Sequence, residues 1–264
     1  MITSFEFNGR SFNIESPEGD WIGGVVERTS SFYEKDMLND ISSLLRPGSL
    51  VVDVGANIGN HTLFFAGVLG CNVIAIEPNA EACGFLSTNV NANGISDAVT
   101  MHSVVIGRGP GKASICRKVR GNLGATRYAA TEAGTSDLTS LDELLSGLSV
   151  SPSLIKIDVE GMELDVLIGS ERLIELCAPV IVVECQSADD YDKVSNFLSR
   201  YAYCAVACYN STPTYVFIKL EEVLASRELL GFICLQAMRS QQQVRELSNS
   251  LKKAWRHIAD LEAR

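Results

Sequence analysis

The stretch Val51-Val52-Asp53-Val54-Gly55-Ala56-Asn57-Ile58-Gly59-Asn60 decides the fold of this chain. An apolar run ends in the acid Asp53, glycines follow at positions 55 and 59, and a helical pattern begins near residue 59. This order predicts a buried strand, a tight turn and a helix N-terminus, because glycine has no Cβ and accepts a positive φ. Asp53 would then stand at the tip of the strand, where its carboxylate can accept hydrogen bonds from a ligand.

A second acid ends the next apolar run, Val73-Ile74-Ala75-Ile76-Glu77-Pro78-Asn79. Glu77 follows Asp53 by 24 residues in the chain. An acid at the tip of a second strand is placed to bind the two ribose hydroxyls of an adenosine cofactor. The two stretches together predict a nucleoside-binding site across the tips of neighbouring strands.

The composition of the turn distinguishes between adenosine cofactors. A dinucleotide turn reads G-x-G-x-x-G and receives a pyrophosphate at a helix N-terminus. Here Asn57 replaces the middle glycine, and the acid Asp53 would repel a phosphate. This favours S-adenosylmethionine, which carries an amino acid and a sulfonium in place of phosphates. The alternatives are a dinucleotide-dependent oxidoreductase and an ordinary strand-to-helix turn without a ligand.

Strands and helices alternate along the chain, which predicts a doubly wound, mostly parallel α/β sheet with ligands at the carboxyl ends of its strands. Strand runs at 203–208 and 214–220 predict a hairpin at one sheet edge. We divide the chain into a β preamble (1–30), an α/β domain (31–220) and a C-terminal helix (221–264). Helices are expected at 31–46, 59–69, 138–148 and 162–177. Loops are expected at 19–24 and over most of 107–137, with one short strand at 113–119.

A second stretch contains several ionisable residues, Leu154-Ile155-Lys156-Ile157-Asp158-Val159-Glu160-Gly161-Met162-Glu163. Its apolar strand delivers Asp158 to the cleft beside the glycine turn, and an acid that ends a buried strand usually has a function. Glu160 and Glu163 lie where the next helix begins. Their alternative role is to cap that helix, since acids are favourable at a helix N-terminus.

Glu184 ends the following strand, so Asp158 and Glu184 are expected on adjacent strand tips. Two such acids suit a divalent cation, Mg²⁺ or Mn²⁺, that would bind an acceptor hydroxyl and lower its pKa. Alternatively, one acid is a general base that takes the hydroxyl proton. His61 and His102 are further candidate bases, although a lone histidine is more often structural.

Composition excludes several classes of partner. With a formal net charge of −10, the chain is unsuited to nucleic acid or to an anionic membrane surface. The chain has no run of 18 apolar residues, so we expect no transmembrane helix. Met1–Glu6 lacks the basic region and apolar core of a signal peptide, and the eight cysteines form no C-x-x-C pair. We therefore expect a cytoplasmic protein with reduced thiols and without zinc.

Heptad spacing marks the end of the chain. One core position holds Leu230, Ala237, Val244, Leu251 and Ile258, and the other holds Ile233, Ser240, Leu247, Ala254 and Leu261. This pattern favours a coiled coil and predicts a homo-oligomer assembled through residues 230–261. The alternatives are a single amphipathic helix packed on the domain and a helix that continues into another module.

Three stretches together resemble the FkbM family of class I S-adenosylmethionine-dependent methyltransferases: Val52–Gly59, Ile76–Asn79 and Ile155–Glu163. Leu138–Asp142 also fits, and the resemblance covers about residues 31–220. It implies a Rossmann-like methyltransferase sheet of seven strands with a reversed last strand. It also implies O-methylation, typically of sugar hydroxyls in glycans or of natural products.

The resemblance also assigns roles to residues. It implies cofactor contacts by the glycine turn, the second strand tip and the third motif, namely Asp53, Val54, Gly55, Ala56, Asn57, Gly59, Asn60, Glu77, Pro78, Asn79 and Asp158. It implies active-site roles for Asp158 and Glu160, and makes Asn122 a candidate substrate-binding residue. Because some similar enzymes use a divalent metal, it also supports the site formed by Asp158 and Glu184. His61 stands where relatives commonly have an aromatic residue, which leaves its role as a base open.

The sequence therefore predicts an S-adenosylmethionine-dependent O-methyltransferase that acts on a hydroxyl of a sugar or glycan precursor. One alternative is methylation of a hydroxyl on a natural product that is not a carbohydrate. Another is a non-catalytic Rossmann-like scaffold assembled through the C-terminal helix.

Overall fold

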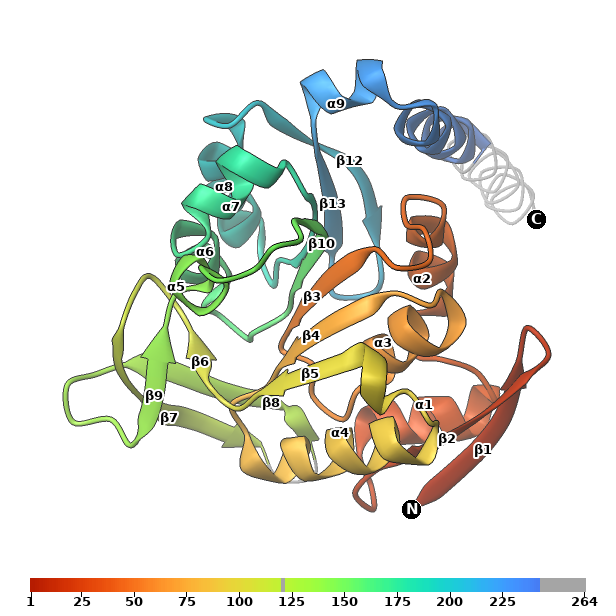
Figure 1. Cartoon of the computed structure of the whole chain (residues 1–264), viewed down its shortest axis with the longest axis vertical. Helices are drawn as coiled ribbons and strands as arrows, with labels where there is room; N and C mark the ends of the chain where they lie inside the picture. Colours follow the sequence, from red (N-terminus) through yellow and green to blue (C-terminus); the bar gives the residue numbers. More distant parts are fainter. Residues whose placement is uncertain (120–121, 243–264) are drawn as a thin grey trace, which may run out of the picture.

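The computed structural model describes residues 1–119 and 122–242. Its centre is a seven-stranded sheet covered by helices on both faces, with strand order β12-β13-β11-β10-β3-β4-β5 (Figure 1). The strands are β3 (Leu50–Val54), β4 (Asn72–Ile76), β5 (Val99–His102), β10 (Pro152–Ile157), β11 (Val180–Glu184), β12 (Tyr203–Tyr209) and β13 (Thr214–Lys219). The strands from β11 to β5 are parallel, whereas β13 runs antiparallel to both of its neighbours. This confirms the doubly wound sheet with a reversed last strand.

Both faces of the sheet are buried, which explains why its strands read as continuous apolar runs. All five residues of β3 are buried, and they alternate between two separate apolar clusters. The first cluster lies under α2 (Lys35–Ser42), α3 (Asn60–Leu63) and α4 (Ala80–Ala92), and a 3₁₀ turn at Ser96–Ala98 follows α4. The second lies under α5 (Leu141–Leu144), α6 (Glu163–Ile168), α7 (Glu171–Cys177) and α8 (Ala188–Ser199).

The N-terminal segment forms the predicted hairpin, β1 (Ile2–Phe7) and β2 (Arg10–Glu15), but the loop expected at 19–24 is wrong. Helix α1 (Trp21–Thr29) occupies that region, and Asp20 caps it by accepting a hydrogen bond from the Gly23 amide. Gly23 is required for packing, because a Cβ there would lie 2.0 Å from Ser16 Oγ. The glycines that suggested a loop therefore serve close helix packing.

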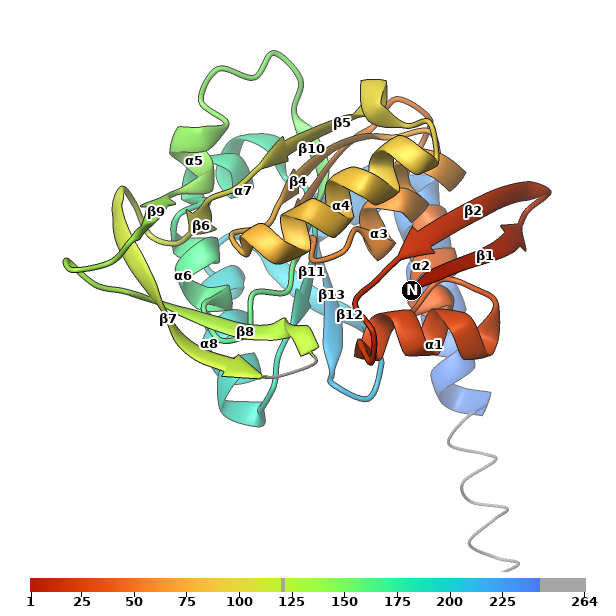
Figure 2. The same ribbon diagram turned by 90° about the horizontal axis from the view of Figure 1, so that it is seen from below.

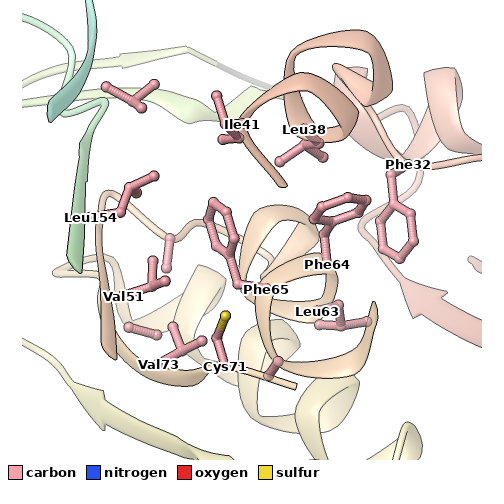
Figure 3. Packing of buried hydrophobic residues seen from close by; sticks show 14 of the residues in the cluster. Phe32, Leu38, Ile41, Val51, Leu63, Phe64, Phe65, Cys71, Val73 and Leu154 are labelled. Carbon is pink, nitrogen blue, oxygen red and sulfur yellow. The ribbon is translucent and has the colours of Figure 1, made fainter. Parts of the chain in front are cut away.

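The first helix after the glycine turn departs from the expected 59–69 helix in its second half. Residues Asn60–Leu63 are α-helical, and Phe64–Val68 continue as a π-helix. The wider turn places Phe64 and Phe65 side by side in the core, where Phe64 meets Phe32 edge to face at 5.4 Å (Figure 3). The hairpin and the sheet therefore share one apolar cluster.

Three other expected helices are shorter than predicted. The 31–46 helix is restricted to α2, because Glu34 before it has a left-handed backbone with φ 59°. The 162–177 helix is divided into α6 and α7 at Gly169, where a Cβ would lie 2.0 Å from the Gly107 carbonyl oxygen. The 138–148 helix is reduced to α5, which Ser140 caps.

The largest correction concerns residues 107–137, which form most of a second sheet rather than loops. Its strands, in the order β6-β9-β7-β8, are β6 (Val105–Ile106), β7 (Gly111–Val119), β8 (Asn122–Ala130) and β9 (Ser136–Thr139). This sheet projects from one side of the main sheet, and β8 runs back across the strand tips (Figure 2). The chain gave no alternating apolar pattern there, because much of β7 is exposed.

The C-terminal segment begins with α9 (Leu220–Ala225) and a helix over 227–242 that lies beside α2 (Figure 1). Phe232 is 3% exposed and belongs to the first apolar cluster. Arg239 forms an ion pair with Asp40, and Gln236 donates a hydrogen bond to the same carboxylate at 3.2 Å. The described part thus packs on the domain. Most of the heptad residues, Val244 to Leu261, lie outside the described residues, so the coiled coil stays a prediction. No helix in the described ranges has the length and apolar character needed to cross a membrane.

Candidate active site

A cavity of about 310 Å³ lies at the carboxyl ends of β3, β4, β10 and β11. This is where ligands bind in open parallel sheets, and the volume suits a small molecule. The wall includes nine of the residues predicted from the sequence: Val54, Gly55, Asn57, Glu77, Pro78, Asn122, Asp158, Glu160 and Glu184. The fold therefore brings the three separate sequence stretches to one place.

Gly55 allows the tips of two strands to meet. Its φ is +81°, and a Cβ there would lie 1.8 Å from the carbonyl oxygen of Asp158. The amides of Gly55 and Ala56 both donate to the Ile76 carbonyl, at 2.9 and 3.0 Å. The glycine turn is thus fixed between β4 and the end of β10, which places Asp158 next to the turn.

Glu77 organises the second strand tip through both carboxylate oxygens. Oε2 accepts a hydrogen bond from the Asn57 amide at 2.9 Å, and Oε1 accepts one from the Asn79 amide at 2.8 Å. Burial raises the pKa of Glu77 to about 7, although these two hydrogen bonds lower it. Carboxylate oxygens have more than one acceptor site each. Glu77 can therefore hold the turn and still accept hydrogen bonds from ligand hydroxyls.

Lys156 is a site residue that the sequence reasoning overlooked. Its ammonium is buried and donates to the Gly55 carbonyl at 2.9 Å. It also lies 3.2 Å from Asp53 Oδ1 and 3.4 Å from Asp158 Oδ2. Burial alone lowers the pKa of Lys156, but the charges of Asp53 and Asp158 raise it above its ordinary value. A lysine inside an otherwise apolar strand was the available signal for this role.

Asp53 itself lies below the cavity wall. It is fully buried, and its Oδ2 accepts a hydrogen bond from the Thr62 hydroxyl at 2.7 Å. Together with Lys156 it supports the turn from beneath. Its predicted direct contact with a cofactor stays a prediction.

Three acids gather on the side of the cavity formed by β10 and β11. Oxygens of Asp158, Glu160 and Glu184 lie within 4.8 Å of one another. Burial raises the pKa of Glu184 to about 9, with help from the charges of Asp158 and Glu160 and from a hydrogen bond with Asp158. Glu184 therefore favours its protonated form, and its carboxyl group lies beside the carboxyl group of Asp158.

Glu160 connects this cluster to the second sheet. It has a left-handed backbone with φ 59° and accepts a hydrogen bond from the side chain of Gln186. Gln186 in turn accepts one from Arg127 on β8. Glu163, in contrast, is the first residue of α6 and accepts a hydrogen bond from the Gly161 amide at 2.8 Å, so it fastens the loop before the helix, and a capping role stays a prediction.

Several predicted residues lie off the cavity wall. Asn60 is buried and hydrogen-bonded to the backbone of Tyr33. His61 is buried, with Nε2 3.2 Å from a carboxylate oxygen of Glu34. Asn79 caps α4 by accepting from the Glu81 amide at 3.0 Å. The remaining predicted residues outside the wall, Ala56 and Gly59, belong to the turn itself. Roles for these side chains in binding or catalysis stay predictions.

Parts of the wall come from segments that carried no readable motif. The preamble and the segment before α2 contribute Trp21, Ile22, Tyr33 and Glu34. The second sheet contributes further residues, including Leu123, Gly124, Thr126 and Tyr128, and Thr212 comes from the β12–β13 turn. The sequence placed a Gly-rich functional loop near residue 122, but neither spacing nor periodicity indicated that α1 closes the cavity.

Comparisons with known proteins agree with this architecture. The sequence model described as "Methyltransferase FkbM domain" matches residues 53–204. The chain is 27% identical over 201 residues to the hexuronic acid methyltransferase AglP of Haloferax volcanii, covering 76% of this chain and 80% of that protein. It is 25% identical to the AMB antimetabolite synthetase AmbE of Pseudomonas aeruginosa, covering 72% of this chain but 11% of that protein.

A solved structure shares the fold. Methyltransferase FkbM from Methylobacillus flagellatus superposes with a TM-score of 0.53 at 22% identity, covering 72% of this chain and 49% of that one. The chain thus spans about half the length of this solved relative.

Proposed function

Because the chain belongs to the FkbM family of S-adenosylmethionine-dependent methyltransferases, we propose that it methylates a hydroxyl group of a sugar or glycan. The observation that carries this proposal is the placement of the neighbouring acids Asp158 and Glu184 in the same cavity as Glu77 and the glycine turn. One part of the cavity thus suits a nucleoside, and the adjoining part suits the removal of a proton from an acceptor.

The residues present fit the methyl donor. Glu77 offers carboxylate oxygens to ribose hydroxyls, as an acid at this strand tip does in nucleoside sites. The side-chain oxygen of Asn57 is buried without a hydrogen-bond partner in the described part of the chain, and Asn57 lines the cavity. A buried acceptor of this kind is normally satisfied, so a ligand donor is expected there.

The acid pair suits the chemistry of O-methyl transfer. S-adenosylmethionine supplies a methyl group on a cationic sulfur. A neutral hydroxyl must lose its proton as its oxygen forms the new bond to carbon. Glu184 favours its protonated form, whereas Asp158 beside it is paired with Lys156 and offers carboxylate oxygens that can accept the hydroxyl proton. Lys156 keeps Asp158 oriented toward the glycine turn, which positions the acceptor for transfer.

Two observations favour a sugar, and in particular an acidic one. AglP, one of the relatives found, is a hexuronic acid methyltransferase. In addition, residues 98–131 contain no Asp or Glu but include six Lys and Arg, within a chain whose net charge is −10. Part of this segment, from Asn122 to Tyr128, contributes to the cavity wall. Initial rates with glucuronides and with the matching neutral glucosides test this preference, and we expect the glucuronides to react faster.

A divalent cation is a second candidate for the acid cluster. Asp158, Glu160 and Glu184 offer the oxygen ligands that Mg²⁺ and Mn²⁺ prefer. A bound cation would attract all three carboxylates and would lower the pKa of Glu184, which burial and the neighbouring acids raise. Methyl transfer measured with EDTA, and then with added Mg²⁺ or Mn²⁺, separates the two mechanisms. Activity that survives EDTA supports the proton-accepting pair alone.

Calorimetric titration with S-adenosylmethionine is the primary test. We expect the intact protein to bind it and Glu77→Ala to lose that binding, whereas Glu81→Ala, on the exposed face of α4, retains it. Asp158→Asn should reduce turnover far more than it weakens donor binding. Binding of NAD in place of S-adenosylmethionine would instead favour an oxidoreductase. Absence of binding to either ligand would favour a scaffold role.

A further inference from the structure

Glu34 is an acid in the cavity wall that lies outside the part of the chain matched to the family, residues 53–204. It directly precedes α2, and its side chain is 11% exposed. No motif identified it, because it stands alone in the segment Ser31–Lys35. Its position in the fold nevertheless places a carboxylate in the same cavity as the glycine turn.

The backbone of Glu34 is strained. Its φ of 59° is left-handed, a conformation that disfavours any residue with a Cβ. Among the described non-glycine residues with this conformation, Glu34, Asn57 and Glu160 all line the cavity. Strain of this kind persists where the surrounding structure enforces it, and it concentrates at functional sites. A glycine would remove the strain at position 34 but would also remove the carboxylate.

The charges around the cavity are unbalanced. Its described wall contains five acids, Glu34, Glu77, Asp158, Glu160 and Glu184, and no Lys, Arg or His. Lys156 lies beneath the wall and is already paired with Asp53 and Asp158. Arg127, from outside the wall, lies 3.8 Å from Glu160. A buried carboxylate without a partner of opposite charge is costly. Glu34 therefore suits a cationic group within a ligand, which need not carry a net positive charge.

Glu34 is separate from the acid cluster that could hold a metal. That cluster consists of Asp158, Glu160 and Glu184, and Glu34 does not belong to it. Its close neighbour is His61, whose Nε2 is 3.2 Å from Glu34 Oε2. His61 is 7% exposed and does not line the cavity. His61 thus lies behind Glu34, where its buried Nε2 makes no hydrogen bond within the described residues, and a proton on Nε2 could be donated to the Glu34 carboxylate.

We propose that Glu34 binds the ammonium group of the amino acid part of the methyl donor, with His61 as its positioning residue. This inference rests on the proposed function. An ammonium donates charge-assisted hydrogen bonds to a carboxylate, whereas a sulfonium has no N–H to donate. The N-terminal segment thereby completes a site whose other contacts come from the sheet.

Three ligands isolate this contact. S-adenosylmethionine carries the ammonium and a cationic sulfur, whereas 5′-methylthioadenosine has the adenosine and a neutral sulfur but no amino acid part; S-adenosylhomocysteine, with the ammonium and a neutral sulfur, should lose affinity as S-adenosylmethionine does and so separates the ammonium from the sulfur charge. We expect Glu34→Gln, which keeps the side-chain shape, to weaken S-adenosylmethionine binding by roughly 10- to 100-fold. The affinity for 5′-methylthioadenosine should stay unchanged. Glu27→Gln, an exposed position on α1, is the matched control and should alter neither affinity.

A second variant separates binding from folding. Glu34→Gly relieves the left-handed strain, so its urea denaturation midpoint should equal or exceed that of the wild type while it loses donor affinity. Equal weakening of S-adenosylmethionine and 5′-methylthioadenosine, or unchanged binding of S-adenosylmethionine by Glu34→Gln, would overturn the inference and leave the methyltransferase proposal intact. Failure of the wild-type protein to bind S-adenosylmethionine would overturn both.

Discussion

Replacing Lys156 with methionine should leave Asp53 as an unpaired charge in the core. Asp53 is fully buried, its Oδ1 lies 3.2 Å from the Lys156 ammonium, and its Oδ2 accepts a hydrogen bond from the Thr62 hydroxyl. At an effective dielectric constant of about 20, two unit charges at this distance attract by roughly 5 kcal/mol. Removing one member of a buried pair typically destabilises by about 3–5 kcal/mol. We expect Lys156→Met to lose a similar free energy of unfolding at pH 8.

The loss should depend on pH in a defined direction. Burial of a carboxyl group that lacks a partner of opposite charge favours its protonated form, because the neutral group costs less to remove from water. A carboxyl group with a raised folded pKa stabilises the fold at low pH, and this contribution is lost as the pH rises through that pKa. The variant should therefore be closer to the wild type at pH 5.5 than at pH 8.

Urea denaturation at both pH values measures this effect. Lys112→Met is the matched control, because Lys112 pairs with Asp137 at 2.7 Å but both side chains are at least half exposed. That variant should match the wild type within error. Adding Asp53→Asn to Lys156→Met should recover part of the loss. Equal stability of Lys156→Met and Lys112→Met at pH 8 would refute the reasoning.

Three further predictions concern the turn, the acid pair and the C-terminal helix. Gly55→Ala should destabilise by roughly 2–4 kcal/mol, because its Cβ would meet the Asp158 backbone at 1.8 Å; Gly94→Ala, also left-handed but in open space, should lose less in the same thermal denaturation. Since burial and neighbouring acids raise the pKa of Glu184 to about 9, stability should fall as the pH rises from 5 to 9, and Glu184→Gln should flatten that decline in urea titrations. Phe232→Ala should lose about 3–5 kcal/mol, because the side chain is 3% exposed in the main apolar cluster; unchanged stability would show that the helix is no part of the fold.

Local sequence was sufficient to predict the main sheet and the acids at the ends of its strands. Asp53, Glu77, Asp158 and Glu184 each end an apolar run, and parallel strands place such ends at one edge of a sheet. The positions of these acids could therefore be predicted from the sequence alone. Gly55 was readable for the same reason, because a turn between a strand and a helix needs a positive φ.

Contacts between distant segments decided the rest. Gly23 lay in a predicted loop and Gly169 in a predicted helix, but the structure uses them to let Ser16 and the Gly107 carbonyl approach. The cavity wall formed by Glu34 and by β8 depends on how the preamble and the second sheet pack over the strand tips. The spacing of residues along the chain does not reveal such packing, because periodicity indicates only which face of a helix or strand is buried. The sequence thus determined where the proposed donor site lies, because acids at the ends of parallel strands meet at one sheet edge, and the tertiary structure decided which segments surround it.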